Sequence, residues 1–148
     1  MELKRSPWDI KDIWQDQVFD IDGIEQVSMI NRRTGERYLS HSKLDYCNPQ
    51  WLDFIKNHEA GHYVLQTDYK DDLTNEKLAD TYGFYETMKK HKSLINVTDA
   101  HSWMLEQGQG DDGNPDHDAR VQWMMYLAAR YDRIVNKNKN ANFDPSIL

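Results

Sequence analysis

The dipeptide Asn48-Pro49 marks a helix start in the middle of the chain. An asparagine side chain caps the first backbone N–H groups of a helix, and proline fits the first helical position, where an N–H has no partner in any case. Apolar residues then recur at helical spacing as far as Leu65. The sequence therefore predicts a helix over about 49–65.

This helix contains the run His58-Glu59-Ala60-Gly61-His62, an H-E-x-x-H pattern. Two histidines four positions apart project from one side of a helix, so both imidazoles can reach a single cation. Glu59 lies roughly 100° around the helix from His58, beside such a cation and not among its ligands. A carboxylate in that position can take a proton from metal-bound water. We therefore expect a metal site with His58 and His62 as ligands and Glu59 as general base.

A second predicted helix, over about 71–92, supplies acidic side chains that suit the same site. Glu76 follows His62 by fourteen residues, and Asp80 lies one helical turn beyond Glu76 on the same face. A glutamate as third ligand leaves the fourth position of a tetrahedral zinc ion open, as catalysis requires. Asp80 is placed to accept a hydrogen bond from a ligating imidazole. The alternative is that both acids simply favour the positive end of the helix.

Two further helices are predicted after this segment. One begins at Thr98 and spans about 98–107, and the long last helix is capped by Asp116 and ends near Asn136. The run GQGDDGNPD between them has the composition of a loop. Its acidic part, 109–118, does not have the EF-hand order of ligands, so we expect a solvated loop and not a calcium site.

The remaining segments complete a single domain over 1–148. Residues 24–40 have the pattern of a β-hairpin around an Asn/Gly turn. Residues 1–20 suit a short amphipathic helix or an extended arm that tucks Trp8 and Trp14 into the body, and the tail 137–148 is expected to be loosely held. The expected fold class is α+β and mainly helical, with a small antiparallel sheet beside the helix of the H-E-x-x-H pattern.

Composition excludes several classes of function. The net charge is −7 with a pI near 5.3, and no long basic stripe is present, which argues against nucleic-acid binding. The one cysteine, Cys47, cannot form an intrachain disulfide and suits a reducing compartment. No stretch approaches the ~20 apolar residues of a membrane span, and the first ten residues lack the apolar core of a signal peptide. We therefore expect a cytoplasmic protein with no membrane partner.

Three motifs together resemble those of a known enzyme family. H-E-A-G-H is followed by E-x-x-A-D at 76–80 and by N-P-x-x-x-x-R-V at 114–121. This order is similar to that of the gluzincin metallopeptidases of the HtpX and CAAX-prenyl-protease type, whose last motif reads H-P-x-x-x-x-R. The resemblance covers about residues 49–136.

The resemblance implies a zinc-dependent peptidase and assigns roles to six residues. Zinc would be bound by His58, His62 and Glu76, the base would be Glu59, and the supporting residues would be Asp80 and Arg120. Asn114 stands where the family has histidine, which removes any role carried by that position, and the nearby His117 is the candidate to replace it. The membrane helices of those relatives are missing, so the chain is closer to the minimal zincins of bacterial regulators and phages.

The function expected from the sequence is hydrolysis of peptide bonds in a peptide or protein substrate, in the cytoplasm, or in a virion if a phage encodes the chain. A narrower form of this hypothesis is a regulatory protease that cleaves one repressor. The alternative is a structural or assembly protein, such as a phage virion component, that retains a zincin scaffold with or without metal. That alternative rests on the aromatic arm, whose Trp8 and Trp14 suit docking on a partner.

Other residues that could serve a site have simpler interpretations. Tyr82 and Tyr85 follow Glu76 on the second predicted helix, and a tyrosine hydroxyl can stabilise an oxyanion. We expect both to pack the helix against the core instead. His101 is a lone histidine, which is more often hydrogen-bonded or at the surface than a ligand.

Overall fold

The computed structural model describes residues 3–21, 24–91 and 115–137. Its central element is α2 (Pro49–Leu65). Asn48 caps this helix as predicted, because its side chain accepts the N–H two residues further on at 2.8 Å, and proline occupies the first position. The helix ends at Gln66, which adopts a left-handed conformation with φ of 50°.

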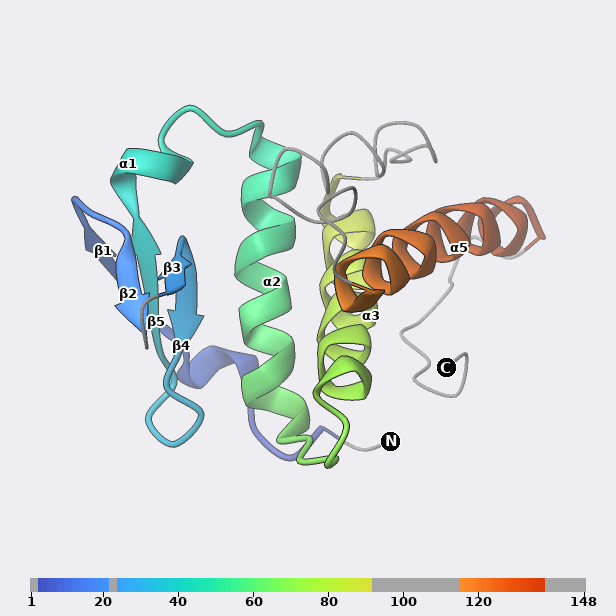
Figure 1. Ribbon diagram of the computed structural model, residues 1–148. Coiled ribbons are helices and arrows are strands. Elements are labelled where there is room, and N and C mark those ends of the chain that lie inside the picture. The colour runs from blue at the N-terminus through green and yellow to red at the C-terminus, as the bar shows by residue number, and fades with distance from the viewer. Residues whose placement is uncertain (1–2, 22–23, 92–114, 138–148) are drawn as a thin grey trace.

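Helix α3 (Asp72–His91) runs antiparallel to α2, and the two lie side by side (Figure 1). Two glycines allow this close approach. A Cβ atom on Gly61 would lie 3.0 Å from the Cα of Ala79, and one on Gly83 would lie 2.8 Å from the backbone nitrogen of His58. The backbones of the two helices are therefore in close contact near both ends of the H-E-x-x-H segment, at His58 and at Gly61.

A three-stranded sheet packs on the other side of α2, away from α3 (Figure 1). Its order is β1 (Lys11–Gln15), β5 (Glu36–Ser40) and β4 (Ser28–Ile30). β4 and β5 pair antiparallel, which confirms the hairpin, whereas β1 pairs parallel to β5. The expectation of an antiparallel sheet was therefore wrong: the sheet is mixed, because a crossover connection brings the N-terminal strand alongside β5 in the same direction.

The segment 24–30 also differs from the prediction of one continuous strand. It divides into β3 (Ile24–Gln26), which pairs antiparallel with β2 (Phe19–Ile21), and β4, which joins the larger sheet. The short helix α1 (His41–Leu44) follows β5 directly.

The N-terminal segment forms a short 3-10 turn, η1 (Pro7–Asp9), and then β1, so of the two predicted alternatives the structure has the extended arm and not the amphipathic helix. Trp14 does reach the body, where it packs against the core and its ring stacks on that of His41 with centroids 4.8 Å apart. Trp8 does not, since it is 92% exposed. The two tryptophans differ because only Trp14 lies on a strand that is paired into the sheet.

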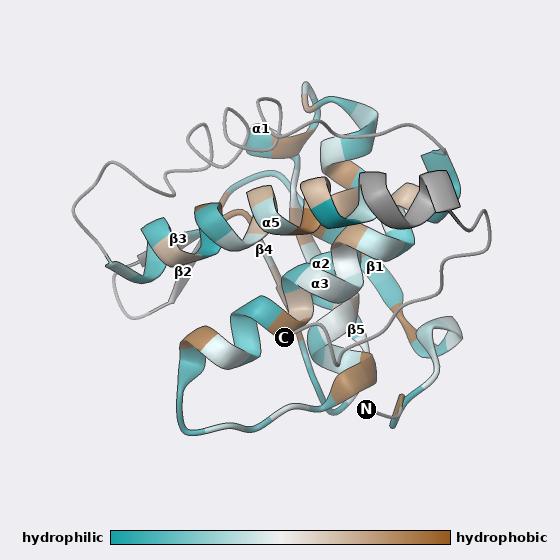
Figure 2. Cartoon of the chain, turned by 90° about the vertical axis from the view of Figure 1, so that its right-hand side faces the viewer, coloured by the Kyte–Doolittle hydropathy of each residue, from teal (hydrophilic) through white to brown (hydrophobic). Residues whose placement is uncertain are grey.

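Helix α5 (Pro115–Lys137) crosses α3 (Figures 1 and 2). It begins at Pro115, one residue before the predicted cap, so Asp116 lies in its first turn instead. Trp123 fixes it on α3 by donating its indole N–H to the hydroxyl oxygen of Thr81 at 2.9 Å. The predicted helix over 98–107, most of the loop before α5 and the tail beyond residue 137 lie outside the described residues.

Two buried apolar clusters hold these elements together. The larger joins the sheet, the first half of α2, the end of α3 and α5; the smaller joins the second half of α2 to the start of α3. Tyr85 lies in the larger and Tyr82 in the smaller, both nearly fully buried, which confirms that they pack the core. Along α2, His58 lies between the two clusters, and His62 lies within the stretch that contributes to the smaller one.

The fold is α+β and mainly helical, as the sequence predicts. Among the described helices, none combines the length and the apolar character that crossing a bilayer needs.

An ion-pair cluster attaches the sheet to α2 at Lys56, two residues before His58. Asp12 on β1 contacts Arg37 on β5 and, at 2.9 Å, Lys56 on α2, and Arg37 also donates to the Lys56 carbonyl oxygen at 2.8 Å. Partial burial by itself raises the pKa of Asp12, but the hydrogen bonds and charges of Arg37 and Lys56 outweigh it and hold that pKa below the usual range.

The depressed pKa of Asp12 predicts a pH-dependent contribution to stability. A carboxylate with a lowered folded-state pKa stabilises the protein above the unfolded-state pKa of about 4, and that contribution disappears as the pH falls through the folded-state value. We expect Asp12→Asn to lose about 1 kcal/mol at pH 7, because solvent screens this half-exposed group. Urea unfolding at a series of pH values should show the difference shrinking below about pH 4; a constant difference would contradict it.

Candidate metal site

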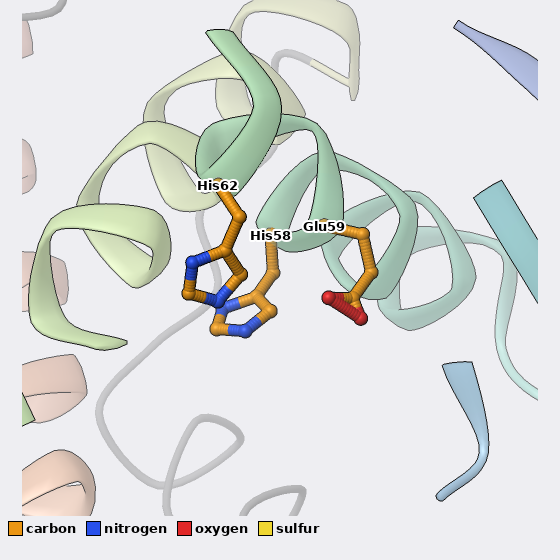
Figure 3. A group of neighbouring side chains, drawn as sticks. All are labelled: His58, Glu59 and His62. Atoms are coloured by element: carbon orange, nitrogen blue, oxygen red, sulfur yellow. The ribbon is translucent and has the colours of Figure 1, made fainter. Parts of the chain in front are cut away.

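His58 and His62 project from one side of α2, with Glu59 beside them (Figure 3). The two imidazole rings are nearly perpendicular, and their centroids are 4.8 Å apart. Ligand-type atoms of His58, Glu59 and His62 all lie within 4.8 Å of one another, the one such group among the residues the structure describes. The geometry is what four-residue spacing on a helix produces.

Glu76 of α3 faces both imidazoles. One of its carboxylate oxygens lies 3.3 Å from Nε2 of His58, and the other lies 3.2 Å from Nε2 of His62. Two atoms that each bind a tetrahedral zinc ion at about 2.0–2.1 Å are about 3.3–3.4 Å apart. Each of the two N···O contacts, made by a different oxygen of Glu76, is close to this spacing, and the three side chains are of the chemical types that bind zinc.

Asp80 of α3 supports His58 through a hydrogen bond. Its carboxylate is completely buried and accepts a hydrogen bond from Nδ1 of His58 at 2.7 Å. That bond orients the ring so that Nε2 faces Glu76 and His62. Asp80 thus occupies the supporting position that the sequence predicts for it.

Arg120 ties α5 to the same two acids. Its Nε and Nη2 atoms donate to the two oxygens of Asp80 at 3.0 and 2.9 Å, and its Nη1 lies 3.5 Å from Glu76. The paired hydrogen bonds give Arg120 a fixed geometry that a lysine could not reproduce. Three helices therefore meet at this point, with histidines from α2, acids from α3 and the guanidinium from α5.

The charges in this cluster shift the pKa values of its members. Burial by itself lowers the pKa of His58, but the charge and hydrogen bond of Asp80, reinforced by Glu76, raise it to about 10. Burial by itself raises the pKa of Glu76, and the two histidines reverse that effect and hold it far below the usual range. Burial likewise raises the pKa of Asp80, but Arg120 and His58 together lower it.

The cluster has an excess of negative charge. Glu59, Glu76 and Asp80 bring three carboxylates, and Arg120 brings one guanidinium, whose pKa is raised by these acids in spite of burial. The excess of two negative charges demands positive charge between the histidines. A proton on His58, whose pKa is raised, supplies part of it in the metal-free protein, and a bound divalent cation would supply positive charge beside neutral imidazoles.

Glu59 lies on the sheet side of the histidines and is only 7% exposed. Its carboxylate accepts a hydrogen bond from the hydroxyl of Ser28 on β4, with 3.0 Å between the oxygens. Ser28 belongs to none of the three sequence motifs. One local feature could have indicated it. Side chains alternate along the strand Ser28-Met29-Ile30, so Ser28 is a polar residue on the same side as Ile30, which packs against the smaller core cluster.

Of the other predicted site residues, the structure describes only His117. His117 is half-buried in the first turn of α5, three residues before Arg120, and does not belong to the histidine–carboxylate group found in the described part of the chain. Asn114 and His101 lie outside the described residues, as does most of the acidic loop 109–118. The expected substitution of His117 for the family's histidine therefore stays a prediction.

No family model, curated protein or solved structure matches the chain. The resemblance to gluzincins therefore rests on the three sequence motifs.

Proposed function

We propose that the protein is a zinc-dependent peptidase with His58, His62 and Glu76 as metal ligands. The observation that carries this proposal is the position of the Glu76 carboxylate, 3.2 and 3.3 Å from the Nε2 atoms of the two histidines. Two imidazoles and a carboxylate with a buried supporting acid are the donor set of a catalytic zinc site. The second carboxylate, Glu59, stands beside the ligands, as a general base must.

The chain's own residues then have defined roles in peptide hydrolysis. A bound zinc ion would lower the pKa of water and polarise a peptide carbonyl. Glu59 accepts the proton from the attacking water and later donates it to the leaving amine. Asp80 keeps His58 in the ligating tautomer, and Arg120 holds Asp80 and Glu76 in place.

The sheet offers a place for an extended substrate. β4 is the last strand in the order β1-β5-β4, and its Ser28 touches Glu59. A peptide that pairs with the outer edge of β4 would be aligned along α2, beside the histidines. We therefore propose an unfolded or extended peptide segment as the substrate, recognised largely through its backbone.

Metal analysis of His62→Ala tests the site. The wild type, purified without chelator, should contain about one equivalent of zinc. Loss of a direct ligand should weaken zinc binding by more than the roughly 10–100-fold that loss of an outer partner causes. Competition with a chromophoric chelator would measure both affinities.

His41→Ala is the matched control for that experiment. His41 also pairs with an aspartate, since its Nδ1 lies 2.7 Å from Asp45, but it belongs to α1 and not to the site. This variant should keep the zinc affinity of the wild type. Equal zinc binding by His62→Ala and His41→Ala would contradict the proposed ligand set.

A structural or assembly role is the second candidate, and the exposure of Trp8 favours it. Trp8 is 92% exposed, so this large aromatic side chain is available for contact with a partner. Absence of zinc from the folded wild type would make this role the better proposal. The two roles are compatible if the protein docks through Trp8 and hydrolyses a substrate at α2.

A further inference from the structure

We infer that Ser28 is a positioning residue for Glu59, an inference that rests on the proposed function. The Ser28 hydroxyl donates to one oxygen of the Glu59 carboxylate, across 3.0 Å between β4 and α2. Glu59 is 7% exposed and Ser28 is partly buried, and a hydrogen bond to a charged acceptor is stronger in such surroundings than at the surface. The bond therefore restricts the rotamers open to Glu59.

The register between β4 and α2 explains why a serine stands here. Successive side chains of a strand alternate between its faces, so Ser28 and Ile30 lie on the same side. Ile30 packs against the cluster that contains Tyr63, and Tyr63 lies one helical turn after Glu59. The strand thus presents an apolar side chain to Tyr63 and a hydroxyl to Glu59.

The contact with Ser28 bears on whether Glu59 acts as a metal ligand or as a general base. Glu59 lies close enough to the histidines to be counted with them as a possible ligand. Because Ser28 occupies one carboxylate oxygen from the sheet side, Glu59 is held beside the ligands and Glu76 is left as the third one. Ser28 thereby keeps Glu59 available to exchange protons with water.

The first test uses metal-free protein and needs no substrate. In protein labelled with ¹³C at glutamate side-chain carboxyls, Glu59 is identified among the seven glutamates by the resonance that Glu59→Gln removes. We expect Ser28→Ala and Ser28→Cys to move this resonance, because alanine lacks the hydroxyl and a thiol is a weak donor. Ser28→Thr keeps the hydroxyl and should leave it in place.

Ser42→Ala is the matched control. Its hydroxyl also bonds to another side chain, Ser40, at 2.9 Å, but lies away from Glu59. It should leave the Glu59 resonance unchanged. The inference is overturned if Ser28→Ala does not move that resonance, or if Ser42→Ala moves it as much.

The second test uses zinc-loaded protein and dye-labelled β-casein, an unfolded substrate. Ser28→Ala should keep the zinc affinity and KM of the wild type and lose about tenfold in kcat, the effect of one lost hydrogen bond to a charged group. Ser28→Thr should restore kcat. If the wild type takes up no zinc, the proposed function fails, and the role of Ser28 fails with it. If Glu59→Gln is inactive while Ser28→Ala has full kcat, only the inference about Ser28 is overturned.

Discussion

Glu59→Gln is expected to reduce hydrolysis of dye-labelled β-casein by about 10²–10⁴-fold while leaving zinc content unchanged. Glutamine has nearly the shape of glutamate and can still accept a hydrogen bond from Ser28, but it cannot accept a proton from water. The ligating atoms of the two histidines and Glu76 are not altered by this change. Initial rates and metal content, measured on the same preparations, separate loss of the base from loss of the metal.

Glu86→Gln provides the control for this experiment. Glu86 lies on α3, where it pairs with Lys89 at 3.1 Å, outside the site. It should hydrolyse casein at the rate of the wild type. Equal rates for Glu59→Gln and the wild type would contradict the role of Glu59 as general base.

Asp80→Asn should lower the free energy of unfolding of the metal-free protein by about 3–5 kcal/mol, the range for breaking a buried ion pair. Asp80 is completely buried and is shared by two cationic partners, His58 at 2.7 Å and Arg120 at 2.9 and 3.0 Å. Removing its charge takes away the carboxylate that Arg120 contacts at 2.9 and 3.0 Å, and the contact of Arg120 with Glu76 is longer, at 3.5 Å. Urea unfolding followed by circular dichroism would measure the loss.

Two further variants show whether the charge is responsible. Asp53→Asn removes another aspartate that bridges α2 and α3, through His91 at 2.6 Å and Lys90 at 3.0 Å, but near solvent. It should lose about 1 kcal/mol or less. Combining Asp80→Asn with Arg120→Met should recover part of the lost stability, because no uncompensated guanidinium remains. A loss below 1 kcal/mol in Asp80→Asn would contradict this account.

The parts of the structure that depend on local sequence were predictable. The cap at Asn48 and the proline that follows it set the start of α2, and the predicted end at Leu65 is confirmed. Helix α3 begins and ends within one residue of the prediction. The four-residue spacing of the histidines places their rings on one side of α2, since helical geometry alone requires it.

The parts that depend on contacts between distant segments were not predictable in the same way. The parallel pairing of β1 with β5 joins residues 25 positions apart, and nothing in either strand specifies its partner or its direction. The contact between Ser28 and Glu59 spans 31 positions for the same reason. The approach of Glu76 to both histidines could be expected only from the order of the motifs, because it depends on how closely α2 and α3 pack.

The close packing of α2 and α3 restricts the two variable positions of the H-E-x-x-H pattern, Ala60 and Gly61, to small residues. Ala60 is buried in the core and Gly61 lies against Ala79, so neither place tolerates a larger side chain without moving α3. Gly83, far along the chain, is restricted in the same way by the backbone of His58. In a survey of all single substitutions, these small residues should rank with the chemical groups in sensitivity, although none of them offers an atom to a metal or a substrate.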